Sequence, residues 1–172
     1  MTISGFVKAY YKYAKETEEK TGISAVAILA QAALESGWGK VAPGNMFFGV
    51  KDTDGINGNE QLLLTTEYSK KANLKFPQII SITPITIKGL PYYKYRVRDY
   101  FRKYDTPEQS FTDHANFFMR NKRYASALKF KHNCRQFLVK VAEAGYATDP
   151  DYKNKMLKMC DLIENAIDKY IK

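Results

Sequence analysis

Glu35 is the side chain whose surroundings point most directly to chemistry. It follows residues 24–34, the most apolar stretch of the chain, and lies four residues after Gln31 on the same face of the expected helix. Charged groups are rarely placed against apolar surroundings without a functional reason. Because burial disfavours an ionised carboxyl and raises its pKa, Glu35 could donate a proton near neutral pH. The alternative is that Glu35 is only the solvent-facing end of a buried helix.

The residues after Glu35 suggest a binding surface. Gly37 and Gly39 allow close approach of the backbone, and Trp38 between them offers an apolar wall or a stacking platform for a ring-shaped substrate. We therefore interpret residues 35–39 as the floor of a cleft.

A second carboxylate is needed if the chemistry is cleavage of a glycosidic bond, which two acidic groups flanking the bond usually carry out. Glu67 is the best candidate, because it lies in the β-like segment 61–68 and alternation puts it on one face with Thr65. Asp52 and Asp54 lie among turn residues, so we interpret both as turn-formers.

Motifs for other chemistries are absent from the sequence. It has no GxSxG nucleophile elbow, no HExxH zinc motif, no paired CxxC and no glycine-rich phosphate loop, so we expect no metal and no cofactor. His114 and His132 are isolated, and we interpret both as structural. Cys134 and Cys160 could pair or stay reduced, and we favour free structural thiols.

The charge of the chain is positive and uneven. It carries 27 Lys and Arg against 18 Asp and Glu, a formal net charge of +9, and residues 91–172 hold 17 basic and 10 acidic groups. Residues 91–104 interleave five basic with six aromatic side chains, as single-stranded nucleic-acid platforms do. A strand with aromatics facing the protein and basic groups facing water is the simpler reading. The excess charge favours a polyanionic partner, either nucleic acid or the bacterial cell wall.

The elements that must position these residues are helices at both ends of the chain. Helical periodicity marks residues 3–20 and 24–35. Capping signals and apolar spacing mark three later helices, which begin near Thr106, Cys134 and Asp149.

The middle of the chain is β-like. The segments FFGVK, QLLLTTEY and IISITPITI are rich in β-branched and aromatic residues, and Pro84 restricts its segment to a sheet edge or a bulge. We predict an α+β fold that is mostly helical, with a small antiparallel β-lobe over about residues 46–104.

The length and composition indicate one folded domain over residues 1–172. An apolar content of 45% with 14% aromatic residues excludes disorder. No apolar run approaches the ~20 residues of a membrane span, and no secretory signal is visible at the N-terminus.

Six motifs, taken in order, resemble glycoside hydrolase family 73. They are AQAALESGWGK (30–40), GNMFFGVK (44–51), TTEY (65–68), FRKYDTPEQSFTDHANFF (101–118), RYASAL (123–128) and AGYATDPDYKNKM (144–156). This family comprises endo-β-N-acetylglucosaminidases of bacterial cell walls, flagellar rod-type hydrolase domains among them. The resemblance covers about residues 5–165.

The resemblance implies a lysozyme-like fold, with a helical lobe and a β-lobe across a substrate groove. It implies hydrolysis of the β-1,4 bond between N-acetylglucosamine and N-acetylmuramic acid in peptidoglycan. Glu35 then corresponds to the general acid, Glu67 to the acidic residue of the β-lobe, and Tyr146 to a third residue near the reacting sugar. The positions expected to line the groove are Trp38, Asn45, Phe48 and Tyr124.

Two continuations are open once Glu35 has protonated the leaving oxygen. In one, Glu67 activates water on the opposite ring face, which requires carboxyls ~6.5–9.5 Å apart and inverts the anomeric centre. In the other, the 2-acetamido oxygen of the substrate attacks, Tyr146 helps stabilise the cyclic intermediate, and configuration is retained.

The expected partner is the glycan strand of peptidoglycan, met by a monomer at the bacterial cell wall in the periplasm or outside the cell. Three alternatives compete with this reading. A muramidase or lytic enzyme of the same fold would cut the other glycosidic bond, and a non-catalytic wall-binding module would keep the groove without turnover. A nucleic-acid binder would leave the surroundings of Glu35 unexplained, so we expect no nucleic-acid partner.

Overall fold

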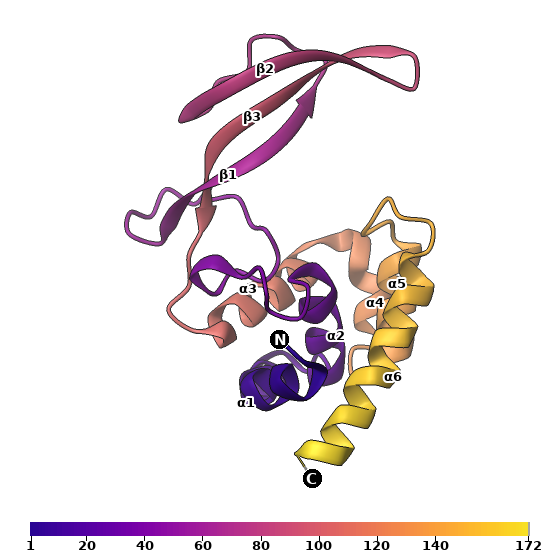
Figure 1. The fold of residues 1–172 in the computed structure, drawn as a ribbon. Coiled ribbons are helices and arrows are strands. Elements are labelled where there is room, and N and C mark those ends of the chain that lie inside the picture. The colour runs from indigo at the N-terminus through magenta and orange to yellow at the C-terminus, as the bar shows by residue number, and fades with distance from the viewer. Residues whose placement is uncertain (172) are drawn as a thin grey trace. The chain divides into compact units, whose positions relative to one another are not determined.

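The computed structural model describes residues 1–171, which form two compact units. One unit comprises Met1–Phe48 together with the described residues from Tyr104 onward, and the other comprises Gly49–Lys103. The first unit is helical and the second holds a three-stranded sheet (Figure 1). The predicted β-lobe of residues 46–104 corresponds in extent to the second unit.

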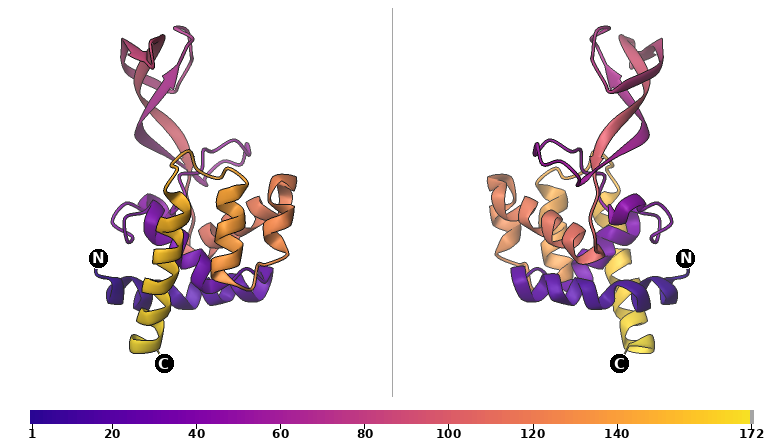
Figure 2. Two further views of the ribbon diagram at one scale, coloured as in Figure 1. Left: turned by 90° about the vertical axis from the view of Figure 1, so that its right-hand side faces the viewer. Right: turned by 90° about the vertical axis from the view of Figure 1, so that its left-hand side faces the viewer.

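Six α-helices and two 3-10 turns make up the described part of the helical unit. They are α1 (Ile3–Thr21), α2 (Ala25–Glu35), η1 (Pro43–Asn45), α3 (Pro107–Arg120), η2 (Lys122–Tyr124), α4 (Ala125–Leu128), α5 (Cys134–Glu143) and α6 (Tyr152–Tyr170). Eight of the residues of α2 are buried, so this helix is enclosed nearly all round, as its uniformly apolar sequence predicts. Figure 2 shows α5 and α6 side by side, with α1 crossing α6 at a steep angle.

A side-chain cap starts α3 where the sequence predicts it. The hydroxyl of Thr106 accepts a hydrogen bond from the Gln109 backbone N–H (3.3 Å) at the start of α3. The Gln109 side chain in turn accepts from the backbone N–H of Asp105 (2.9 Å), which ties the entering chain to the first turn. Asn133 caps α5 in the same way, accepting from the Gln136 backbone N–H (3.0 Å), although the sequence reading named no cap there.

The last helix begins later than predicted. Its expected start was Asp149, but α6 begins at Tyr152. Asp149 instead makes a turn, since its carboxylate accepts from the Asp151 N–H (2.9 Å) and its carbonyl accepts from the Tyr152 N–H (3.1 Å). Hydrogen bonding by the Asp side chain competes with the helix here.

The prediction of two free thiols is wrong. Cys134, the first residue of α5, forms a disulfide with Cys160 of α6, and their Cα atoms lie 6.4 Å apart. The separation of 26 residues carried no sign of this pairing. Packing of α5 against α6 brings the two side chains together.

The sheet unit contains three antiparallel strands in the order β1-β3-β2. They are β1 (Glu60–Ser69), β2 (Gln78–Ile87) and β3 (Leu90–Arg102). Pro84 lies in the edge strand β2, which confirms its predicted placement. Lys88 and Gly89 join β2 to β3, with φ of 50° and 77°, and positive φ at both central residues is typical of a tight type I′ hairpin.

The prediction of a strand at FFGVK is wrong. This segment contributes only a single β-bridge between Lys51 and Phe101. Phe47 and Phe48 pack in the helical unit instead, where the Phe47 ring lies 5.0 Å from that of Phe111. Tertiary packing of the aromatic pair therefore overrides its β propensity.

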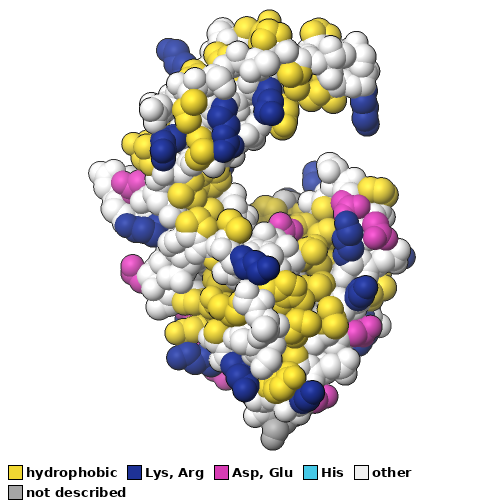
Figure 3. All heavy atoms as spheres, in the orientation of Figure 1, with side chains coloured by type: hydrophobic (Ala, Val, Ile, Leu, Met, Phe, Trp, Pro, Cys, Tyr) yellow, Lys and Arg dark blue, Asp and Glu magenta, His cyan; other side chains and the backbone are white. Residues whose placement is uncertain are grey.

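The middle of strand β3 sorts its side chains as the simpler reading of residues 91–104 predicts, but Tyr100 lies on the basic face and is 45% exposed. Tyr95 and Val97 on one face are fully buried, whereas Lys94 and Arg98 on the other face are exposed. Dark-blue basic side chains therefore lie among apolar ones on the surface of the sheet unit in Figure 3. Within residues 1–171, no helix has both the length and the apolar character required to cross a bilayer.

Candidate active site

Glu35 is the last residue of α2, and a rigid turn follows it. The hydroxyl of Ser36 donates to the carbonyl of Ala32 (2.5 Å) and accepts from the Gly39 N–H (2.8 Å). Gly37, Trp38 and Gly39 all have positive φ, at 57°, 61° and 73°. A non-glycine residue in this conformation is strained and tends to mark functional sites, so the turn fixes the chain directly after the carboxyl.

The carboxyl of Glu35 has an unusual electrostatic setting. Part of the residue is open to solvent. The protein around the carboxyl still removes enough water to raise its pKa above the ordinary value. Among residues 1–171 the structure gives this carboxyl no hydrogen bond and no ion pair. Glu35 thus emerges at the end of a buried helix, and its surroundings favour the protonated form of the acid.

Two tyrosines lie within electrostatic reach of Glu35. Burial raises the pKa of Tyr146 and of Tyr152, and the negative charge of Glu35 adds to both shifts. The two rings lie 5.5 Å apart. The buried Gln31 side chain of α2 donates to the Tyr152 hydroxyl (3.0 Å), so the face of α2 that carries Glu35 is joined to the start of α6.

His114 supports Tyr146 from α3. Its Nε2 lies 2.8 Å from the Tyr146 hydroxyl, and its ring stacks on Phe48 at 3.7 Å with an interplanar angle of 7°. Burial lowers the pKa of His114 to about 3, against a smaller opposing effect of Asp113. The imidazole is therefore neutral at physiological pH. The expected structural role fits this packing, but no sequence signal linked His114 to Tyr146.

The four predicted groove residues all lie in the helical unit, in different settings. Phe48 and Tyr124 belong to the aromatic cluster around Tyr146. Phe48 stacks on His114, which in turn contacts Tyr146. Tyr124 is only 3% exposed, and its ring lies 6.3 Å from the Tyr146 ring. Trp38 packs its ring against Phe6 of α1 at 5.6 Å.

Asn45 is tied to the chain that leads into α3. Its side-chain amide donates to the carbonyls of Tyr104 (3.0 Å) and Asp105 (3.2 Å). Like Trp38 it has a positive φ, at 55°.

Glu67 lies on β1 of the sheet unit and is ion-paired. The Lys51 ammonium contacts the Glu67 carboxylate at 2.7 Å and the Asp99 carboxylate at 2.6 Å, and it also lies 4.4 Å from the Phe101 ring. Thr65 donates weakly to the same Glu67 oxygen (3.4 Å). No sequence signal pointed to Lys51 or Asp99, because only the packing of segments distant in the sequence brings them together with Glu67.

The three charged side chains face a cavity within the sheet unit. It has a volume of about 410 Å³, and its lining includes Lys51, Glu67, Asp99 and the ring of Phe76. A concave surface that combines an aromatic ring with a few polar groups has the general features of a small-molecule site.

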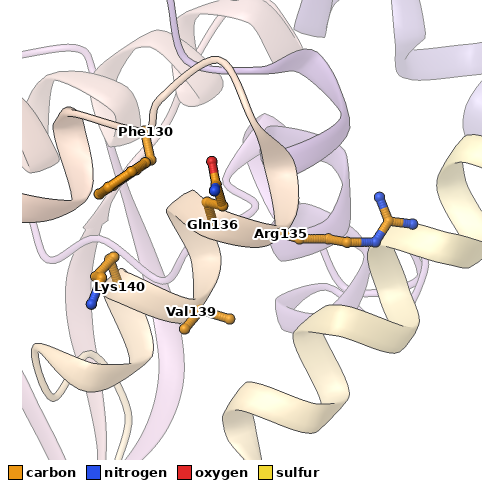
Figure 4. Close-up of a pocket in the computed structure, with 5 residues that line it drawn as sticks. All are labelled: Phe130, Arg135, Gln136, Val139 and Lys140. Atoms are coloured by element: carbon orange, nitrogen blue, oxygen red, sulfur yellow. The ribbon is translucent and has the colours of Figure 1, made fainter.

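A second cavity of about 230 Å³ lies beside α5 (Figure 4) and contains none of the predicted site residues. Its lining comprises Phe130, Arg135, Gln136, Val139 and Lys140. Arg135 extends toward α6, where it pairs with Glu164 at 2.8 Å. The pocket holds no acid, so it does not carry the chemistry.

The structure therefore holds two candidate acids in separate units: Glu35, without a cationic partner among residues 1–171, in the helical unit, and the ion-paired Glu67 in the antiparallel sheet unit. Acidic residues of this kind are the groups that glycosidases use. A protein-family model named Glucosaminidase and described as mannosyl-glycoprotein endo-beta-N-acetylglucosaminidase matches residues 11–165. The chain therefore belongs to the glucosaminidase family.

Relatives and solved structures agree with this assignment. Peptidoglycan hydrolase FlgJ of Pseudomonas aeruginosa is 32% identical over 161 residues, covering 90% of this chain and 35% of that protein. Exo-glucosaminidase LytG of Bacillus subtilis is 28% identical, covering 96% of this chain and 52% of that protein. The glycoside hydrolase domain of Salmonella typhimurium FlgJ superposes with a TM-score of 0.70 at 28% identity, covering 100% of this chain and 94% of that one. The chain thus spans about a third of the length of the Pseudomonas aeruginosa relative and about half of that of the Bacillus subtilis relative.

Proposed function

We propose that the chain is a peptidoglycan hydrolase that cleaves the β-1,4 bond between N-acetylglucosamine and N-acetylmuramic acid, with Glu35 as the general acid. The observation that carries the proposal is the setting of Glu35. Its carboxyl is accessible, lacks any cationic partner among the described residues, and has a pKa raised by burial. Such a group holds its proton at a higher pH than an ordinary glutamate and can deliver it to a leaving sugar oxygen.

Tyr146 is proposed to act on the same sugar. Burial raises the pKa of the Tyr146 phenol, and the negative charge of Glu35 adds to this shift. The phenol therefore stays protonated and can donate or accept a hydrogen bond with the 2-acetamido group. If the acetamido oxygen attacks the anomeric carbon, Tyr146 orients it and configuration is retained. If Glu67 activates a water molecule, configuration is inverted.

The glycan strand is proposed to contact the aromatic and amide side chains around this centre, namely Trp38, Asn45, Phe48 and Tyr124. Residues 1–172 then form one catalytic domain that acts as a monomer at the cell wall. The Cys134–Cys160 disulfide supports that location, because disulfides persist in oxidising compartments outside the cytoplasm.

Analysis of new reducing ends tests which bond is cut. Purified peptidoglycan is digested, reduced with borohydride and hydrolysed to its amino sugars. A glucosaminidase yields reduced glucosamine, whereas reduced muramic acid would show a muramidase and overturn the proposal. A chain that binds peptidoglycan without releasing reducing ends would be the wall-binding module instead.

The size of the first products tests the mode of cleavage. The family description specifies an endo-glucosaminidase, while the Bacillus subtilis relative is named an exo-glucosaminidase. We propose endo cleavage, which releases long glycan fragments early in digestion. Early release of terminal units only would show exo cleavage. Proton NMR of the first-formed anomer separates inversion from retention in the same digests.

A further inference from the structure

The imidazole of His114 is held in one orientation. One face stacks on Phe48 at 3.7 Å, and Phe118 meets the ring edge-on at 4.8 Å and 74°. The Tyr146 hydroxyl lies 2.8 Å from Nε2. His114 is buried, with 9% of the residue exposed, so this hydrogen bond is shielded from water. Which of the two atoms donates depends on which ring nitrogen carries the proton.

That proton can be assigned from the partners of the two ring nitrogens. Among residues 1–171, the structure gives Nδ1 no hydrogen-bond partner, whereas Nε2 has Tyr146. A neutral imidazole carries one N–H and one acceptor nitrogen. A buried N–H without an acceptor is costlier and rarer than a buried acceptor without a donor. The N–H therefore belongs on Nε2.

We propose that His114 is a positioning residue whose Nε2–H donates to the Tyr146 oxygen and thereby turns the phenol proton away from His114, toward the 2-acetamido group of the bound sugar. The inference rests on the proposed function for the identity of the sugar. It gives Tyr146 a fixed role as a donor, because one lone pair of its oxygen is occupied by the imidazole. The acceptor is the acetamido carbonyl, the group that attacks the anomeric carbon in the retaining route.

The tautomer can be measured without any activity. The chain has two histidines, so a two-dimensional ¹⁵N–¹H spectrum of the imidazole rings is assigned by comparison with His132→Gln. We expect His114 to be neutral at pH 7 with the proton on Nε2. A proton on Nδ1, or a doubly protonated ring, would overturn the proposal whatever the enzyme cuts.

A double-mutant cycle tests the functional link. His114→Gln keeps a side-chain N–H near the position of Nε2, while His114→Leu removes it. We expect the leucine variant to lower kcat on peptidoglycan by about 3–10-fold, the value of one neutral hydrogen bond, with KM less affected. The glutamine variant should recover most of the loss.

The same substitutions in a Tyr146→Phe background decide between positioning and packing. Without the phenol, His114→Leu should cause no further loss of kcat. An equal loss in both backgrounds, or an equal loss for glutamine and leucine, would contradict the proposal. If the leucine variant fails to fold, the glutamine variant and the tautomer measurement still decide. Failure of the proposed function would appear separately, as Glu35→Gln retaining wild-type activity.

Discussion

The two units hold their candidate carboxylates in opposite ways. In the helical unit, Glu35 ends a buried helix without a cationic partner among residues 1–171, and burial raises the pKa of its carboxyl. In the sheet unit, Glu67 contacts the Lys51 ammonium at 2.7 Å. An acid that must begin protonated suits the first setting. The neighbouring cation of the second setting can hold an acceptor group in place, so the contrast supports the division of roles proposed above.

Removing the proton of Glu35 should have the largest effect. Glu35→Gln keeps the size of the side chain and cannot protonate a leaving oxygen, so we expect kcat on purified peptidoglycan to fall by ~10²–10⁴. Glu19→Gln, an exposed change on α1, is the matched control and should retain wild-type activity. Release of reducing sugar measures both, and a circular-dichroism melt checks that each variant is folded. If Glu35→Gln keeps activity within a few-fold of wild type, Glu35 is not the general acid.

Breaking the disulfide tests the stability of the helical unit. Cys134 and Cys160 join α5 to α6, so replacing both by serine should lower the free energy of unfolding by about 2–4 kcal/mol. The sheet unit contains no such link, and activity at low temperature should be nearly unchanged because neither cysteine lies at the site. Denaturant titration with and without reductant measures the difference. Equal stability of the oxidised wild type and the double variant would contradict it.

Removing the cation beside Glu67 should have an intermediate effect on activity. Lys51→Met keeps apolar contact with Phe101 but frees Glu67, and we expect kcat to fall by about 10–10², since small misplacements of reacting groups are costly. Stability should change by less than ~1 kcal/mol because the pair is partly exposed. Lys94→Met, at an exposed site on β3, is the control. If Lys51→Met and Glu67→Gln are both harmless, the acetamido route is favoured and Glu67 loses its role.

The smallest expected effect is on the pH dependence of stability. Because the folded-state pKa of Glu35 is raised above the ordinary value of 4.5, the folded chain binds this proton more tightly than the unfolded chain. The resulting stabilisation is full below about pH 4.5 and is lost as pH rises through the folded-state pKa. Glu35→Gln lacks this loss, so its melting temperature relative to wild type should rise between pH 4 and 7. A difference that stays constant or falls would show that the pKa is not raised.

The sequence was informative wherever a signal is local. The cap at Thr106, the enclosed helix α2 and the edge position of Pro84 follow from residue types and spacing that act within a few residues. Glu35 was likewise recognisable, because a charge at the end of an apolar helix is a local anomaly.

The remaining features depend on packing between distant segments. The Cys134–Cys160 pair needs α5 beside α6, and the contact of His114 with Tyr146 spans 32 residues. The strand predicted at FFGVK does not form, because the Phe47 ring packs against Phe111 in the helical core. No periodicity in one sequence encodes such pairings.

The most direct test of the general-acid role of Glu35 compares leaving groups. Wild type and Glu35→Gln are assayed on a peptidoglycan oligosaccharide with a sugar leaving group and on the matching dinitrophenyl glycoside, whose leaving group departs without protonation. We predict that Glu35→Gln loses ~10²–10⁴ in kcat on the sugar substrate and far less on the dinitrophenyl substrate. Equal loss on both substrates would contradict the account, because Glu35 would then contribute something other than the proton.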